Sequence, residues 1–226
     1  MPKVSRIQKF SSLIHKKKGL LKCVFSTLIF QVFITILVVY FLHKNNLKIL
    51  EKGKKSLLFL IPSFIIMLVL IYFMVSVKMP FYRRFILFIV FSILEGIILH
   101  LATKYVSNEV ILSALLSTIS IFSTFVVIGF ILVYFGIDIN WIGLILFFVL
   151  LGIIITRIVF YFVPPTENKK RLITSLSIFL FSVYILYDTN NILLKYQDTG
   201  IDCVRGALDY YLDILNLFLN LLDRGG

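Results

Sequence analysis

The sequence predicts an all-α integral membrane protein with seven transmembrane helices, forming a single domain over residues 1–226. Three observations support this fold class. Hydrophobic residues make up 60% of the chain and the mean hydropathy is +1.01, whereas soluble domains contain roughly 45–50% apolar residues. The apolar residues form runs of about 20, the length that crosses a hydrocarbon core of roughly 30 Å. The runs are apolar on all sides, which argues against the alternating strands of a membrane barrel.

Short polar segments divide the chain into seven predicted spans, so consecutive helices are expected to be antiparallel neighbours. The basic segment before the first span lacks the apolar core of a cleavable signal peptide, and the first span is therefore expected to remain in the membrane. Pro164 and Pro165 end the fifth span because proline cannot donate the next backbone hydrogen bond. The predicted spans are 20–42, 57–77, 85–102, 110–134, 139–162, 172–194 and 203–222.

The chain has a formal net charge of +12, which in a soluble protein would favour nucleic-acid binding. Here the basic residues fall in short loops and at helix ends, where they contact headgroups and attract anionic lipid. The lipid bilayer is therefore an expected partner and nucleic acid is not. Cys23 and Cys203 lie far apart without a Cys-x-x-Cys or Cys/His cluster. Neither a zinc site nor a disulfide framework is indicated, and both are expected to be packing residues.

The last two spans carry acids where hydrocarbon is expected, and intramembrane acids are costly and usually functional. In the seventh span the polar residues recur at i, i+4, i+7 and i+11, which places them on one helical face. The sixth span has a similar stripe at i, i+4 and i+7. Two such stripes on consecutive antiparallel helices are expected to meet. The stripes are Asp209, Asp213, Asn216 and Asn220 in the seventh span, and Tyr184, Asp188 and Asn191 in the sixth.

Facing carboxylates of Asp188 and Asp213 would have a chemistry that depends on pH. Two charges about 4 Å apart repel by about 4 kcal/mol at an effective dielectric near 20, and sharing one proton relieves this repulsion. The pair would latch the helices when singly protonated, and would push them apart or take up a cation when fully ionised. Hard cations such as Ca²⁺ prefer carboxylate and carbonyl oxygens. The alternative is a purely structural role for these polar residues, as hydrogen bonds between helices that contribute about 0.6–2 kcal/mol per contact.

Two further charged residues lie inside predicted spans. Glu95 falls in the middle of the third span, too deep to reach the interface easily, so it must be neutral, paired or hydrated. A functional or pore-lining role is expected for it. Arg157 lies late in the fifth span, where snorkelling to the interface and pairing with an intramembrane acid are both open. Both residues join the two stripes as candidates for an ion path.

The segments FSVYILYDTNNILLK and ALDYYLDILNLFLNLL resemble the signature of the transmembrane Bax inhibitor motif family, also called the LifeGuard family. SILEGIIL is similar to the Glu-bearing third helix of its Golgi anti-apoptotic branch, and Lys22, Phe25 and Gln31 sit where that branch has its first helix. The resemblance implies seven helices with the last one central. It also implies a Ca²⁺-permeable leak in a bacterial plasma membrane, or in an ER/Golgi-type or other host membrane.

By motif match, the resemblance makes Asp188 and Asp213 the pH latch and Glu95 an ion-path carboxylate, while Asp209 stands where the family has a small residue. The predicted function is a pH-sensitive Ca²⁺ leak channel, not an enzyme, with Ca²⁺ and protons as its ions and no other cofactor. Eukaryotic and viral members of the family are linked to suppression of apoptosis. Membrane proteins that regulate cell death are accordingly implied partners.

Two alternatives stay open from the sequence. The first is a non-conducting anti-apoptotic protein that acts by binding other membrane proteins. The second is an intramembrane aspartyl protease, because Tyr187-Asp188 resembles one half of such a site. Against the protease, the second aspartate lies in Tyr-Leu-Asp rather than Gly-x-Gly-Asp, and no Pro-Ala-Leu element follows it.

Overall fold

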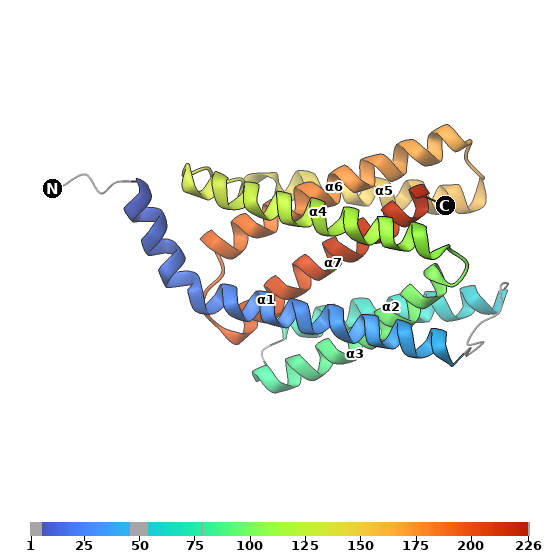
Figure 1. Ribbon diagram of the computed structural model, residues 1–226, viewed down its shortest axis with the longest axis horizontal. Coiled ribbons are helices and arrows are strands. Elements are labelled where there is room, and N and C mark those ends of the chain that lie inside the picture. Colours follow the sequence, from blue (N-terminus) through green and yellow to red (C-terminus); the bar gives the residue numbers. More distant parts are fainter. Residues whose placement is uncertain (1–5, 46–53, 78, 226) are drawn as a thin grey trace. The chain divides into compact units, whose positions relative to one another are not determined.

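The computed structural model describes residues 6–45, 54–77 and 79–225. Within these ranges the chain forms seven α-helices and one short 3-10 helix, with no strand (Figure 1). The all-α prediction is therefore confirmed, with one helix for each predicted span. The helices are α1 Arg6–Lys44, α2 Lys54–Ser76, α3 Phe81–Thr103, α4 Asn108–Tyr134, η1 Asn140–Ile142, α5 Gly143–Phe162, α6 Glu167–Leu194 and α7 Gly200–Gly225.

Five of the described helical segments are long and apolar enough to cross a membrane, judged by length and composition alone: α1, α3, α4, η1 with α5, and α6. The outer surface of α5 is rich in large apolar side chains, with Phe148 60% and Phe162 75% exposed. Such a surface is stable in contact with lipid rather than with water. The apolar part of α2, Ile65–Ser76, is shorter, and α7 is less apolar because of its polar stripe. The chain is a multi-pass integral membrane protein.

Helix α1 begins at Arg6, within the segment that the sequence predicts to be a polar tail ahead of the first span. The helix extends through this segment because it contains no proline and its apolar side chains recur at helical spacing, at Ile7, Phe10 and Ile14. The Phe10 ring packs edge-on against Tyr134 of α4, with ring centroids 5.4 Å apart. The polar connection expected around residues 44–55 lies largely outside the described residues.

The helices divide into two compact units. The first, here called the α6 unit, contains α1 up to Gly19, α4, η1, α5, α6 and α7 from Leu212 onward. The second, the α3 unit, contains α1 from Leu20, α2, α3 and α7 up to Tyr211. Helix α7 contributes residues to both units, and after Arg205 none of its residues is exposed until Arg224.

Helix α6 packs against both α4 and α5 in the α6 unit (Figure 1). The approach to α4 is close at Gly129, where an added Cβ would lie 2.6 Å from the Cβ of Thr189. Small residues allow membrane helices to pack at such short range. Helices α5 and α6, which carry Arg157 and the α6 stripe, therefore belong to one packed group with α4 and the second half of α7.

In the α3 unit, α2 packs against α3, and a buried arginine joins the end of one to the start of the other. Arg84 is 1% exposed. Its guanidinium donates hydrogen bonds to the carbonyl oxygens of Met74 and, at 3.0 Å, Val77. These carbonyls lie at the carboxyl end of α2, where helix geometry leaves acceptors without partners in their own helix. Arg84 thus caps α2 from α3.

The α3 unit also contains a disulfide between Cys23 of α1 and Cys203 of α7, with Cα atoms 5.7 Å apart. The expectation that both cysteines are merely packing residues is therefore wrong. The partners are separated by 180 residues in sequence, so their pairing depends on the tertiary contact of two helices. Nothing in the local sequence around either cysteine reveals that contact.

Candidate functional site

The stripe on α6 is a buried polar run in the middle of the α6 unit. Asp188 is 7% exposed, and Thr189, Asn190 and Asn191 beside it are also buried, while Tyr184 is half-buried one turn earlier. The run faces inward because α6 packs on two neighbouring helices at once. The polar side chains are thereby withheld from lipid, which could not satisfy their hydrogen bonds.

The stripe on α7 combines a buried acid with two amides. Asp213 is 4% exposed and Asn220 is also buried, whereas Asn216 is half-buried. The amide nitrogens of Asn216 and Asn220 donate to the carbonyl oxygens one turn back, those of Leu212 at 2.8 Å and Asn216 at 2.7 Å. Each bond uses one of the two N–H donors of its amide and leaves the amide oxygen available to groups on other helices.

The acids of the two helices share one neighbour, Tyr184 of α6. The carboxylates of Asp188 and Asp213 both act electrostatically on the phenol of Tyr184. Tyr184, Asp188 and Asp213 are here called the acid cluster. Burying two carboxylates near each other is costly when both are charged.

Arg157 on α5 reaches the same face of α7, two turns further toward its carboxyl end. Its guanidinium donates hydrogen bonds to Oδ1 of Asn220 and, at 3.4 Å, to Oγ of Ser177 on α6. These partners are neutral, so the contact differs from the carboxylate pairing that the sequence left open. The Arg157 side chain is exposed on α5, which agrees with a long cation lying along the helix surface.

Asn190 is a structural member of the site that sequence reasoning missed. Its Nδ2 donates to the carbonyl oxygen of Ile137 at 3.0 Å, and its Oδ1 accepts the backbone N–H of Ile139 at 3.4 Å. Asn190 therefore holds α6 against the turn that follows α4. That turn includes Gly136 at φ 76°, a conformation that glycine adopts without strain. The only sequence signal was an asparagine pair in an apolar run.

A second missed contact joins the amino end of α6 to the carboxyl end of α7. Asp223 accepts a hydrogen bond from Thr174 at 3.0 Å and forms an ion pair with Lys170, also at 3.0 Å. Each oxygen of the carboxylate has its own partner. This contact, here called the Asp223 tie, lies ten residues beyond Asp213 along α7.

Glu95 and Asp209 belong to the α3 unit and are half-buried. Glu95 acts electrostatically on Tyr211, whose hydroxyl lies 2.6 Å from Oγ1 of Thr35 on α1. Thr35 also donates to the carbonyl oxygen of Gln31 at 3.0 Å. Glu95 is thus placed beside a second buried polar group. A continuous ion path from Glu95 to the acid cluster stays a prediction.

The carboxylates alone do not make a closed calcium site. In the described part of the chain, no group of three or more His, Cys, Asp or Glu side chains is arranged to hold a metal ion. Ca²⁺ takes six to eight oxygen ligands, so an ion at Asp188 and Asp213 would draw most of its ligands from amides, backbone carbonyls or water.

The chain matches the family model described as "Inhibitor of apoptosis-promoting Bax1" over residues 17–224. It is 31% identical over 164 residues to Bax inhibitor 1 of Schizosaccharomyces pombe, covering 73% of this chain and 60% of that protein. It is 29% identical over 133 residues to Protein LIFEGUARD 4 of Arabidopsis thaliana, covering 59% of this chain and 53% of that protein. An uncharacterised protein of Campylobacter jejuni is 37% identical over 86 residues, 38% of this chain and 36% of its own length.

The aligned parts span 60% and 53% of the first two relatives. The family match, in contrast, runs from within α1 to the last turn of α7 and so includes both acids of the acid cluster. The family resemblance carried by the motifs on the last two helices is thereby confirmed. The chain belongs to the Bax inhibitor family of multi-pass membrane proteins.

Proposed function

We propose that the chain is a pH-sensitive Ca²⁺ leak channel, with Asp188 and Asp213 as its latch, and that it takes part in controlling cell death. The observation that carries the proposal is the convergence of two buried carboxylates from α6 and α7 on Tyr184. Neutral hydroxyl or amide side chains would join two membrane helices at lower cost. The acids therefore favour a role that uses their charge.

The expected direction of the pH effect follows from the charge of the pair. With one shared proton, the carboxylates of Asp188 and Asp213 hydrogen-bond to each other and hold α6 against α7. At higher pH both carry charge, their repulsion favours separation of the helices, and the negative site attracts a divalent cation. Ca²⁺ flux is therefore expected to rise with pH.

The test is Ca²⁺ flux from proteoliposomes containing the full chain, measured across a pH series. Asp213→Asn retains the shape of the side chain but cannot ionise, so we expect a severalfold lower flux at high pH and a flat pH profile. Asp198→Asn is the matched control, because Asp198 is exposed in the connection between α6 and α7. If Asp213→Asn had the flux and pH profile of the unmodified protein, the latch would be disproved.

The family description favours a second candidate, a non-conducting inhibitor of cell death. Such a protein would act by binding membrane proteins of the death machinery. Expression in yeast cells that produce Bax separates the two functions. Protection by both the unmodified chain and Asp213→Asn, without flux in liposomes, would favour the binding function, whereas parallel loss of protection and flux would favour the channel.

A further inference from the structure

Two adjoining pockets lie at the end of the α6 unit where α4 and α6 begin and α7 ends. The first has a volume of about 310 Å³ and lies between the first two turns of α6 and the last residues of α7. The second has a volume of about 460 Å³ and lies between the first turns of α4 and the end of α7. Arg224 and Gly225 line both pockets, so one ligand can occupy the two together.

The α6–α7 pocket carries a net positive charge. Its lining contains three basic residues, Lys170, Arg171 and Arg224, and two acids, Glu167 and Asp223, which leaves one positive charge. The Asp223 tie already engages Lys170. Glu167 lies in the first turn of α6, where the helix dipole stabilises a negative charge. The exposed guanidinium groups of Arg171 and Arg224 are therefore the cations placed to receive an anion.

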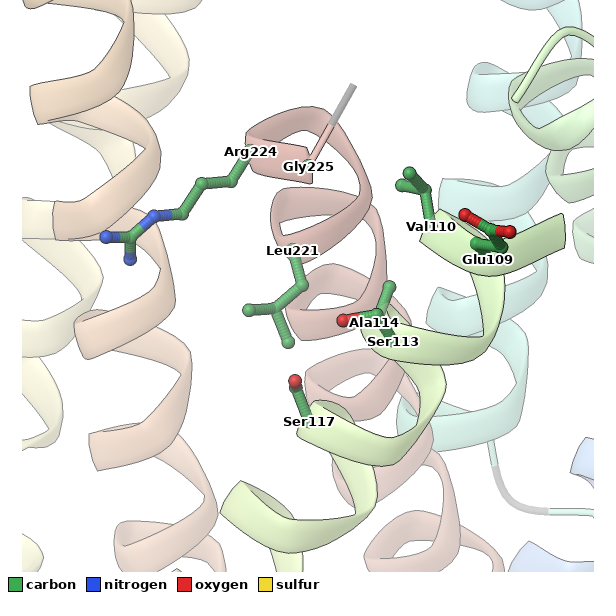
Figure 2. A pocket seen from close by; sticks show the side chains of 8 residues that line it. All are labelled: Glu109, Val110, Ser113, Ala114, Ser117, Leu221, Arg224 and Gly225. Carbon is green, nitrogen blue, oxygen red and sulfur yellow. The ribbon is translucent and has the colours of Figure 1, made fainter. Parts of the chain in front are cut away.

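The α4–α7 pocket is an amphipathic groove. Figure 2 shows Leu221 projecting from α7 beside the α4 turns that carry Ala114 and the hydroxyls of Ser113 and Ser117. Arg224 and Glu109, the two charged residues of this pocket, project to opposite sides of it in the same view. The carboxylate and the guanidinium therefore do not point toward each other.

The groove borders the lipid-facing surface of α4. Leu112 and Leu116, on the same helix segment, are each 58% exposed, which is the expected state of apolar side chains that contact acyl chains. On α6, the charged segment ends at Arg171 and the apolar run begins at Leu172. This change from charged to apolar residues marks the level at which a helix passes from headgroups into hydrocarbon.

We propose that the two pockets together bind one anionic phospholipid. The phosphate lies between Arg171 and Arg224, because planar guanidinium groups form paired, charge-assisted hydrogen bonds with phosphate oxygens. One acyl chain lies in the α4–α7 groove against Ala114 and Leu221. A free phosphate would satisfy the arginines but not the groove, and a neutral lipid would fill the groove without using the charge. This site is separate from the acid cluster and does not depend on ion conduction.

The test is native mass spectrometry of the full chain in detergent, with phosphatidylglycerol or phosphatidylcholine added at equal concentration. We expect phosphatidylglycerol to be retained preferentially. Combining Arg171→Gln with Arg224→Gln should weaken its binding by at least about tenfold. The control combines Lys169→Gln on α6 with Lys195→Gln directly after it, which removes two exposed charges that line neither pocket, and should retain the preference.

A second pair of variants tests the groove. Ser113 is exposed and lines the groove, so Ser113→Phe should block the acyl chain and weaken phosphatidylglycerol binding. Ser120→Phe, at an exposed position on α4 outside the groove, should not. Thermal unfolding followed by helical circular dichroism identifies any variant that fails to fold, and the other variants then decide the result.

Three results would overturn the proposal. One is equal retention of both lipids by the unmodified chain. Another is unchanged phosphatidylglycerol binding after the double arginine substitution. The third is full displacement of the lipid by inorganic phosphate together with unchanged binding by Ser113→Phe, which would assign the arginines to free phosphate. None of these readouts involves Ca²⁺ flux, so failure of the channel proposal would leave this one standing.

Discussion

Single residues in this protein are most informative where a buried charged side chain donates hydrogen bonds to backbone carbonyl groups. Arg84 is the example in the α3 unit, since both of its hydrogen bonds go to carbonyl oxygens at the end of α2. In the sequence, Arg84 is one of two adjacent arginines after a short connection, and no sequence feature distinguishes its role from that of Arg83. Only the packing of α2 on α3 shows that one arginine is a helix cap.

Replacing Arg84 with methionine is expected to lower the free energy of unfolding by about 2–4 kcal/mol, because buried carbonyl groups lose their donors. Arg83→Met is the control, since Arg83 directly precedes Arg84 in the same helix and its side chain is exposed. Thermal unfolding in detergent compares the two variants. Equal melting temperatures for Arg84→Met and Arg83→Met would show that the cap does not stabilise the fold.

At the scale of helices, close packing of α4 on α6 holds the α6 stripe in place. Gly129→Val is expected to cost about 1–3 kcal/mol, because the new side chain would overlap Thr189, next to Asp188, and force the helices apart. Gly152→Val is the control, since a Cβ on that residue of α5 meets nothing within 4 Å. Thermal unfolding measures the difference, and a Gly129→Val variant as stable as the control would contradict the close approach.

The disulfide joins α1 to α7 in the α3 unit and gives a further prediction about helices. Cys23→Ser is expected to lower the melting temperature under non-reducing conditions, since a crosslink over a long loop typically contributes about 2–4 kcal/mol. Reductant should lower the melting temperature of the unmodified chain to the same degree and leave that of Cys23→Ser unchanged. Peptide mapping without reductant should recover Cys23 linked to Cys203. A melting temperature insensitive to reductant would argue against a stabilising bond.

For the whole molecule, insertion into the membrane can be tested with the fluorescence of Trp141, the single tryptophan of the chain. Trp141 is 72% exposed and begins the apolar segment of η1 and α5. Tryptophan at the end of a membrane helix lies at the headgroup level. Its fluorescence should therefore be quenched by phospholipids brominated near the headgroup, and less by lipids brominated at the chain terminus. Efficient quenching by aqueous iodide with no effect of brominated lipid would place this end of α5 outside the bilayer.

Composition and periodicity were sufficient to predict the helices, because each apolar run is long enough to form one. The helical start of α1 was missed, since its polar residues concealed an apolar spacing of three and four residues. The stripes on α6 and α7 were visible as patterns within one helix. Asn190, the Asp223 tie and the disulfide were not, because each joins groups far apart in the chain and depends on how helices pack.

The Asp223 tie has a mechanical consequence for the acid cluster. It holds the amino end of α6 to the carboxyl end of α7, and Asp213 lies ten residues away along α7, a distance of roughly 15 Å at 1.5 Å per residue. A swing of α7 by about 10° around this tie would carry Asp213 by roughly 2.6 Å. In the proposed latch, rotation of α7 about this contact would separate Asp213 from Asp188 while the amino end of α6 and the carboxyl end of α7 stay joined.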